Sequence, residues 1–468
     1  MLRRLVALGA ITLACAGGNA SAAGSVQTEQ LPLMMSDGTM LACSRTSPGV
    51  PSAAGRPGVV LFHGLGATRR DMESIAEQFL APAGFETLQC DARGNGSSGG
   101  MFGLDGARDV QDARELFDWF AGQLGSTNIG ALGVSLGGGA VWNALAAGVP
   151  FRAAVAAATW TNLLTALAPQ NLSKSGLAQY LASLVPANRW DPQLLAGAAG
   201  LIAGSDLGPA AALSAARSAG PKLSTITTPT LLLQGRHDFL FDIDQALAAY
   251  KALRGPKRLY VGDLGHSPAK NPPAELPTYL AEATKWFDRF LNGRANGIDK
   301  AQLELAHDPW DGKTTSYTSL PPTHTVSVTL PGSSTMSGAT GKVVRSVRVT
   351  GGPHETFGDS NVVVRYSGAQ GWDRLVAVLA VAGSPTPITA GGVKLTGASG
   401  KVTIRLMNEA VRFAAGKKLV LYLSSASVAQ DPGDTLYVTP VSPQARITIG
   451  RVTLNISVLK RAVSKALH

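Results

Sequence analysis

Cysteine and long hydrophobic runs are scarce in this sequence, which excludes several classes of protein. Only 3 of the 468 residues are cysteine, so at most one disulfide can form. No run of about 18 apolar residues occurs after the N-terminus, so we expect no membrane-spanning helix in the mature chain. Interleaved basic and aromatic residues are also lacking, which argues against nucleic-acid recognition. With 45% hydrophobic and 15% charged residues, the chain is globular, and its length favours two domains.

The N-terminus has the pattern of a secretion signal. Arg3 and Arg4 provide the positive start, an apolar run follows over 5–14, and Ala20 to Ala22 form an A-x-A cleavage site. We therefore predict a signal peptide over 1–22 and a secreted or periplasmic protein. A buried first helix is the alternative, but it would not explain the Arg-Arg start together with the small-residue end.

The three cysteines bear on anchoring and on cross-linking. Lipoprotein anchoring at Cys15 is disfavoured, because Thr12 stands where such proteins usually have leucine. If Cys15 leaves with the signal, Cys43 and Cys90 remain on neighbouring predicted strands. An even count in an exported protein is compatible with one disulfide, and two buried thiols are the open alternative.

Positive charge is concentrated in the C-terminal part of the chain. Residues 301–468 carry 17 Lys and Arg against 9 Asp and Glu, whereas residues 1–300 carry 24 against 22. A basic C-terminal domain favours weak attachment to an anionic surface or polymer. Ordinary solvated lysines on a soluble domain are the simpler alternative.

Two patterns of secondary structure divide the chain. Up to residue 297, short apolar strands alternate with helical segments, which predicts an α/β domain with a mostly parallel sheet and helices on both faces. The expected strands lie at 31–35, 40–43, 58–62, 86–90, 129–132, 153–158, 230–234 and 257–261, and the expected helices at 70–82, 107–124, 137–147, 243–253 and 275–292. The domain spans 23–297, with an Ala- and Leu-rich helical cap at about 160–222. A long crossover with extra core helices is the alternative to a cap.

The remaining residues have a different composition. Asn-Gly pairs at 292–293 and 296–297 and the pair Pro321-Pro322 mark a predicted linker over 298–325. Beyond it, Thr- and Val-rich stretches with period two predict an all-β sandwich over 326–468.

The most informative motif is G-x-S-x-G at Gly133 to Gly137. It follows the apolar run 129–132 and opens a small-residue stretch, as a strand, sharp turn and helix require. Ser135 would lie at the tip of this nucleophile elbow with an exposed hydroxyl. A serine hydroxyl needs a neighbouring base, and the base needs an acid to orient it.

An acid and a base follow the serine in the order that α/β-hydrolases use. Asp238 lies in a G-x-x-D turn after the 230–234 strand, and we predict it as the acid. Asp242 and Asp244 compete, but they fall where capping aspartates are ordinary. His266 follows the last predicted strand and is the predicted base. His237, next to the acid, is expected to be structural.

The oxyanion formed by attack on a carbonyl needs preorganised donors. The backbone N–H of Leu136, beside the nucleophile at a helix N-terminus, is one candidate. The second is the N–H of Leu65 in the glycine-containing loop after the 58–62 strand. His63 is expected to brace this loop.

At these residues the chain resembles the α/β-hydrolase superfamily over about residues 30–292. The stretch that begins at Asp91 is similar to the D-x-R-G-x-G-x-S-x-G pattern of the Xaa-Pro dipeptidyl-peptidase and cocaine-esterase-like group. That resemblance implies a C-terminal jelly-roll-like sandwich. The group typically has a tyrosine in the oxyanion loop and often one after the nucleophile. Leu65 and Leu136 stand at these places here, which favours esters over peptides.

We therefore expect a secreted serine hydrolase that cleaves carboxylic esters through an acyl-enzyme. Ser135, Asp238 and His266 form the predicted triad, and the substrate is a small-molecule or lipid-like ester. No cofactor or metal is implied. An Xaa-Pro dipeptidyl-peptidase-like enzyme with the same triad is the alternative. A surface-binding protein with an inert hydrolase half is a third hypothesis, which the complete triad argues against.

Overall fold

The computed structural model describes residues 25–49, 56–350, 353–429 and 434–460. The predicted signal peptide over 1–22, including Cys15, lies outside these residues.

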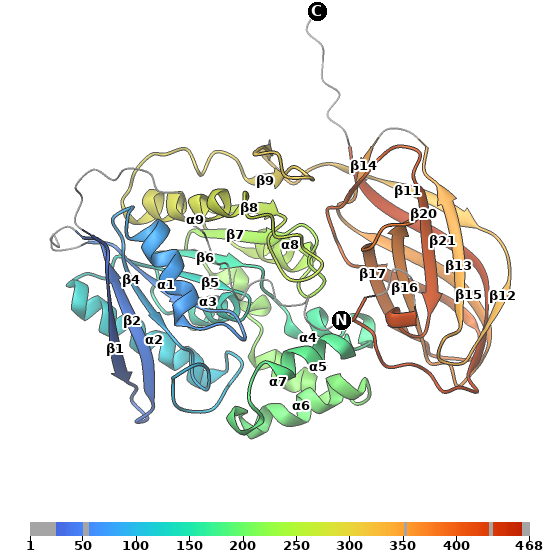
Figure 1. Ribbon diagram of the computed structural model, residues 1–468, viewed down its shortest axis with the longest axis horizontal. Coiled ribbons are helices and arrows are strands. Elements are labelled where there is room, and N and C mark those ends of the chain that lie inside the picture. Colours follow the sequence, from blue (N-terminus) through green and yellow to red (C-terminus); the bar gives the residue numbers. More distant parts are fainter. Residues whose placement is uncertain (1–24, 50–55, 351–352, 430–433, 461–468) are drawn as a thin grey trace, which may run out of the picture.

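One ten-stranded sheet organises the N-terminal two-thirds of the chain (Figure 1). Strands β3 to β9 run parallel to one another, and antiparallel strands flank them at both edges. The order in space is β1 (Gln27–Met34), β2 (Met40–Ser47), β4 (Glu86–Cys90), β3 (Gly58–Phe62), β5 (Ile129–Val134), β6 (Ala153–Ala157), β7 (Thr230–Gly235), β8 (Lys257–Gly262), β9 (Leu303–Ala306) and β10 (Thr314–Tyr317). The central strands are almost fully buried, as their continuous apolar sequences predict.

Helices cover both faces of this sheet. On one face lie α2 (Ala107–Leu124), α3 (Leu136–Ala146) and α8 (Ile243–Ala252), whose apolar side chains share a core. On the other lie α1 (Arg69–Ile75), η2 (Ala76–Leu80) and α9 (Leu276–Leu291). Trp286 and Phe287 of α9 are completely buried. Truncation of such a side chain typically costs about 3–5 kcal/mol, so these layers contribute strongly to stability.

The predicted linker over 298–325 is not a simple linker. It contains β9 and β10, which extend the hydrolase sheet beyond β8. Sequence patterns missed them because each has only four residues and turn residues surround both. β9 is nevertheless completely buried, because it pairs with β8 along one side.

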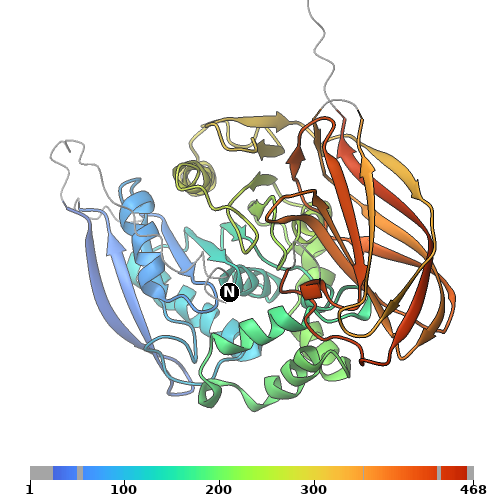
Figure 2. The same ribbon diagram turned by 45° about the vertical axis from the view of Figure 1, so that its right-hand side comes forward.

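Helical segments fill the interval between β6 and β7, where the sequence predicts a cap. They are α4 (Leu163–Leu167), η3 (Pro169–Asn171), α5 (Ser175–Ser183), η4 (Ala187–Arg189), α6 (Pro192–Ala203), α7 (Gly208–Ala216) and η5 (Gly220–Thr225). Both views show these green helices beside the orange-to-red sandwich (Figures 1 and 2). Gln170 makes two hydrogen bonds to the sandwich: its Nε2 donates to the Thr403 carbonyl at 2.8 Å, and its Oε1 accepts the Arg405 N–H at 2.7 Å. The cap therefore packs against the sandwich as well as the sheet.

The C-terminal part is a sandwich of two antiparallel sheets. One sheet has the order β11 (Thr323–Leu330), β21 (Arg446–Leu459), β15 (Ser360–Gln370) and β18 (Gly400–Leu406), with β12 (Ser334–Ser337) also on β21. The other has the order β13 (Lys342–Arg348), β20 (Lys418–Ser424), β16 (Arg374–Val381) and β17 (Pro387–Lys394). β14 (His354–Glu355) pairs with β19 (Arg412–Phe413), and η6 spans Ser427–Ala429. The alternating side chains of both sheets form one apolar core, as the period-two pattern predicts.

Cys43 and Cys90 form a disulfide between β2 and β4. The two cysteines lie directly opposite each other in the antiparallel pairing of these strands. Of the two possibilities that the sequence left open, the structure therefore has the disulfide and not two buried thiols. Across the described ranges, no helix combines the length and the apolar character that crossing a membrane requires.

Candidate active site

Ser135 lies at a sharp turn between β5 and α3. Its backbone has φ 55° and ψ −115°, a strained conformation for a residue other than glycine. The flanking glycines permit this turn: a Cβ atom on Gly133 would overlap the Gly137 carbonyl, and one on Gly137 would overlap the Phe62 carbonyl. Strand and helix thus approach more closely than any side chain would allow, which gives the G-x-S-x-G motif its physical reason.

The three residues predicted as a triad are brought together by three separate loops. His266 follows β8, and its Nε2 lies 2.9 Å from Ser135 Oγ. Its Nδ1 lies 2.9 Å from Oδ2 of Asp238, which follows β7. All three loops follow the carboxyl ends of parallel strands, where catalytic groups collect in such sheets. The competing Asp242 and Asp244 instead bond Asn408.

Asp238 is completely buried, and its carboxylate is fully hydrogen-bonded. Oδ1 accepts the N–H groups of Leu240 and Phe241, both at 3.0 Å. Oδ2 accepts the backbone N–H of His266 at 3.0 Å in addition to the ring. Burial alone would raise the pKa of Asp238, but the charge and hydrogen bonds of His266 and the Phe241 N–H hold that pKa below its usual value. The carboxylate therefore stays ionised and able to orient the imidazole.

The two predicted oxyanion donors flank the serine. Leu136 is the first residue of the eleven-residue helix α3, so its N–H is one of the helix's unpaired N-terminal donors. Leu65 lies on the loop Gly64–Gly66, which lines the same cavity as Ser135. A Cβ atom on Gly64 would lie 3.5 Å from Ser135 Cβ, so this loop runs directly beside the nucleophile.

His63 braces the loop that carries Leu65. Its Nδ1 lies 2.8 Å from the Gly64 carbonyl, and its Nε2 lies 2.8 Å from the N–H of Ala92. With Nδ1 donating and Nε2 accepting, both contacts belong to one neutral tautomer. Burial lowers the pKa of His63, which keeps the ring neutral. The ring has no role as a base toward Ser135, whose partner is His266.

A cavity of about 360 Å³ opens on Ser135 and His266. Most of its wall is apolar, and it is built by three parts of the chain. The sheet and its helices contribute Met72, Ile75, Phe79, Leu276 and Leu280; the cap contributes Leu177, Leu181 and Leu184; and the sandwich contributes Pro385, Pro387 and Leu436. The cap and the sandwich therefore shape the substrate site together.

Charged groups are few in this cavity. None of the described residues that line it is Lys or Arg, and Asp71 and Asp434 are its carboxylic acids. Asp71 caps α1, since its Oδ2 accepts the Thr68 N–H at 2.8 Å. Asp434 accepts the Leu436 N–H at 2.9 Å through Oδ1, and burial raises its pKa to about 6. Oδ2 of Asp434 has no hydrogen-bond partner among the described residues.

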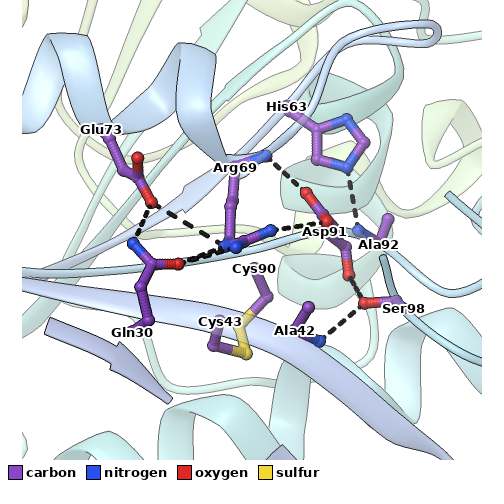
Figure 3. Close-up of a disulfide and its surroundings, with 10 residues drawn as sticks. All are labelled: Gln30, Ala42, Cys43, His63, Arg69, Glu73, Cys90, Asp91, Ala92 and Ser98. Atoms are coloured by element: carbon purple, nitrogen blue, oxygen red, sulfur yellow. Dashed lines mark hydrogen bonds and ion pairs between the residues drawn. A yellow bond between two sulfur atoms is a disulfide. The ribbon is translucent and has the colours of Figure 1, made fainter. Parts of the chain in front are cut away.

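The D-x-R-G stretch has a scaffolding role (Figure 3). Asp91 accepts the backbone N–H of Arg69 at 2.7 Å and its guanidinium at 2.8 Å. The Asp91 carbonyl accepts Ser98 Oγ–H at 2.6 Å, and Ser98 Oγ in turn accepts the Ala42 N–H at 2.9 Å. Arg93 is buried between Asp112 and Asp37. These bonds tie β2, the end of β4 and the start of α1 together beside the disulfide, and none reaches the nucleophile.

His237, the residue before the acid, is buried, and its Nε2 has no partner among the described residues. Burial and the nearby positive charge of Lys270 lower the pKa of His237 to about 3. The ring is therefore neutral in the folded protein, as a structural histidine would be.

The lowered pKa of His237 predicts a pH-dependent stability. Between about pH 6.5, the unfolded value, and the folded value, only the unfolded chain binds the proton, so stability falls as the pH falls. A His237→Asn variant lacks this proton uptake. On going from pH 7 to pH 4.5, the free energy of unfolding of the native protein should therefore fall by about 2 kcal/mol more than that of the variant. Guanidinium unfolding at both pH values measures this, and an equal pH dependence in both proteins would contradict it.

Three residues at the site escaped sequence reasoning. Lys174 of the cap is buried and donates from Nζ to the Phe239 carbonyl at 2.8 Å. Asn408 and Glu409 of the sandwich contact the turn that carries Asp238. Glu409 lies 171 residues from Asp238, and no motif marks such a contact. In the part of the chain that the structure describes, no group of His, Cys, Asp and Glu is arranged to hold a metal ion.

Comparisons with known proteins agree with this architecture. Residues 37–180 match the family model of X-Pro dipeptidyl-peptidase (S15 family). A comparison with curated proteins gave no match. A CocE/NonD family hydrolase from Staphylococcus aureus is similar in structure, with a TM-score of 0.70, 15% identity and coverage of 97% of this chain and 100% of that chain.

Two further solved structures are similar over nearly their full length. An alpha-amino acid ester hydrolase has a TM-score of 0.69 and 14% identity, and the match covers 95% of this chain and 98% of that chain. An aminopeptidase from a marine sediment Thaumarchaeota archaeon has a TM-score of 0.67 and 13% identity, with coverage of 97% and 99%. At these identities the likeness shows the fold.

The predicted fold class is confirmed: an α/β-hydrolase followed by a C-terminal β-sandwich. The predicted resemblance to the Xaa-Pro dipeptidyl-peptidase and cocaine-esterase-like group is also confirmed. The family match and the structural neighbours together support the prediction that the chain is a serine hydrolase enzyme.

Proposed function

We propose that this serine hydrolase cleaves carboxylic esters through an acyl-enzyme on Ser135. As Ser135 Oγ attacks the carbonyl carbon, His266 takes its proton and then passes it to the departing alcohol. Water, deprotonated by His266, then attacks the acyl carbon, the bond to Ser135 Oγ breaks, and His266 returns the proton to Oγ as the acid leaves. Asp238 holds His266 in the correct tautomer and stabilises the imidazolium. The two contacts of 2.9 Å, from Ser135 to His266 and from His266 to Asp238, support these roles.

The N–H groups of Leu65 and Leu136 stabilise the oxyanion of the tetrahedral intermediate. The α3 N-terminus favours negative charge at this place, and the backbone of the 64–66 loop runs beside Ser135. Both donors belong to the backbone, so neither depends on a flexible side chain.

The apolar cavity is the main observation in favour of an ester as the substrate. Its wall offers Leu, Phe, Met and Pro side chains from the hydrolase domain, the cap and the sandwich. An uncharged ester with an apolar acyl or alcohol chain gains free energy by burial there, at about 25 cal/mol per Å². A substrate ammonium would lose its hydration in this wall, and its charge would be poorly compensated.

An Xaa-Pro dipeptidyl-peptidase-like activity is the second candidate. The match of residues 37–180 to the X-Pro dipeptidyl-peptidase family supports it. Asp434, one of the two carboxyls that line the cavity, is the group that could receive a substrate ammonium. It acts alone, however, because Asp71 is engaged as the cap of α1.

Substrate comparison separates the two candidates. We expect kcat/KM for uncharged p-nitrophenyl esters, from acetate to dodecanoate, to exceed kcat/KM for a glycyl-prolyl p-nitroanilide by about 100-fold or more. Burial of an incompletely paired ammonium costs several kcal/mol, and the activated ester is also intrinsically more reactive than the anilide, so both effects contribute to this ratio. A proline anilide cleaved as well as the best ester would contradict the ester proposal and favour the peptidase.

We also propose that the protein is exported. The N-terminal pattern of two arginines, an apolar run and an A-x-A site supports export. The disulfide between Cys43 and Cys90 supports it independently, because such bonds persist in oxidising compartments. Attachment of the basic C-terminal part to an anionic surface is a further proposal, supported by its net positive charge.

A further inference from the structure

The turn that carries Asp238 is bound by a short segment of the sandwich, Asn408–Ala410, between β18 and β19. Ala410 and Arg236 form a two-way bridge: the Ala410 N–H donates to the Arg236 carbonyl, and Arg236 Nε–H donates to the Ala410 carbonyl, both at 2.7 Å. Arg236 is almost completely buried. The beginning of the acid turn is therefore joined directly to the C-terminal part.

Glu409 is in direct contact with the acid itself. Its Oε2 accepts the backbone N–H of Asp238 at 2.9 Å. Glu409 is only 2% exposed, and its Oε1 has no partner among the described residues. Burial, together with the nearby carboxyls of Asp242 and Asp238, raises the pKa of Glu409 well above its usual value. A neutral carboxyl can accept this N–H without adding a second charge behind the acid.

Asn408 fixes the far side of the same turn. Its carbonyl accepts the Ile243 N–H at 3.1 Å, and its N–H donates to Asp242 Oδ2 at 3.2 Å. Its side-chain amide donates to Asp244 Oδ1 at 2.8 Å. The first turn of α8 is thereby held in place, and the two aspartates that compete with Asp238 in the sequence are engaged in this contact.

The cap supports the middle of the turn. Lys174 Nζ donates to the carbonyls of Phe239 and Leu240, at 2.8 and 3.3 Å. The acid turn is therefore held by the sandwich at its beginning and end and by the cap at its centre.

We propose that Glu409 is a positioning residue, through which the sandwich fixes the backbone of the triad acid and completes the active site. The inference rests on the proposed function, since it takes Asp238 as the acid. Asp238 reaches His266 through its side chain and Glu409 through its N–H, so a shift of its backbone moves the carboxylate away from the imidazole. Displacements of about 1 Å at such a distance from the chemistry can cost about 100-fold in rate.

Three variants of the full chain test this role with a p-nitrophenyl ester. Glu409→Ala removes the acceptor, and we expect kcat to fall by about 10- to 100-fold, with little change in KM because the residue does not line the cavity. Glu409→Gln keeps a neutral acceptor oxygen and should recover most of this loss. Asn361→Ala is the matched control, because it removes a partly buried hydrogen bond, donated by Asn455 at 2.8 Å, within the sandwich and away from the acid turn.

The outcomes separate positioning from general stability. A Glu409→Ala variant with native kcat overturns the inference, as does an equal loss in all three variants. Should Glu409→Ala not fold, Glu409→Leu replaces it, since it fills the volume without an acceptor. A native protein without ester hydrolase activity overturns the proposed function and this inference together, whereas an active native protein with an equally active Glu409→Ala variant overturns the inference alone.

Discussion

Replacement of Ser135 by alanine should lower kcat/KM for a short p-nitrophenyl ester by about 10⁴-fold or more. Without Oγ no acyl-enzyme can form on this residue. His266 Nε2, which lies 2.9 Å from Ser135 Oγ in the native protein, would have no hydroxyl from which to take a proton. Transition-state stabilisation by the Leu65 and Leu136 N–H groups would remain, so a small residual rate above that in water is expected. Steady-state kinetics with the purified variant measure the loss.

A matched serine variant serves as the control for this loss. Ser205 lies in the cap, is exposed and does not line the cavity. Ser205→Ala should retain native kcat/KM. Undiminished hydrolysis by Ser135→Ala would show that Ser135 is not the nucleophile and would overturn the proposed mechanism.

The second large effect is expected at the acid. Asp238→Asn should lower kcat by about 10³- to 10⁴-fold, because the amide fills the same space as the carboxylate but cannot accept the hydrogen bond of His266 Nδ1. In the native protein, Oδ2 of Asp238 lies 2.9 Å from His266 Nδ1, which donates its proton to the carboxylate in the catalytic tautomer. An amide N–H₂ in the same place would be a second donor facing that N–H. The ring would take the tautomer that leaves Nε2 protonated, and it could no longer accept the proton of Ser135.

Asp244→Asn is the control for the acid assignment. Asp244 lies in the same turn region, but its Oδ1 accepts a hydrogen bond from Asn408. We expect its effect on kcat to be at least about 100-fold smaller than that of Asp238→Asn. Equal losses in both variants would remove the reason to assign the acid role to Asp238.

The sequence predicts the elbow and the order of the triad because each of these features has a local pattern. Gly133 and Gly137 are dictated by close backbone contacts within a few residues of Ser135. Asp238 and His266 each follow a continuous apolar strand, and parallel strands bring their carboxyl ends to one edge of the sheet. The geometry therefore follows from the strand pattern together with the fold.

Contacts between segments far apart in the sequence have no local pattern, so the sequence did not predict them. Glu409 is one of ten glutamates in the sequence, and its role depends on how the sandwich packs on the acid turn. β9 and β10 were hidden for a related reason, since a four-residue strand is recognised by its partner and not by its own sequence. The apolar wall likewise needed the structure, because Leu181, Leu276 and Pro387 meet only in three dimensions.

Trapping of the acyl-enzyme tests the central claim most directly. The native protein, mixed with an excess of p-nitrophenyl ester and quenched within the first turnover, should carry one acyl group, and peptide mass mapping should place it on Ser135. A burst of about one p-nitrophenolate per chain should accompany it. An acyl group on another residue, or turnover by an active enzyme that never acylates Ser135, would contradict the account.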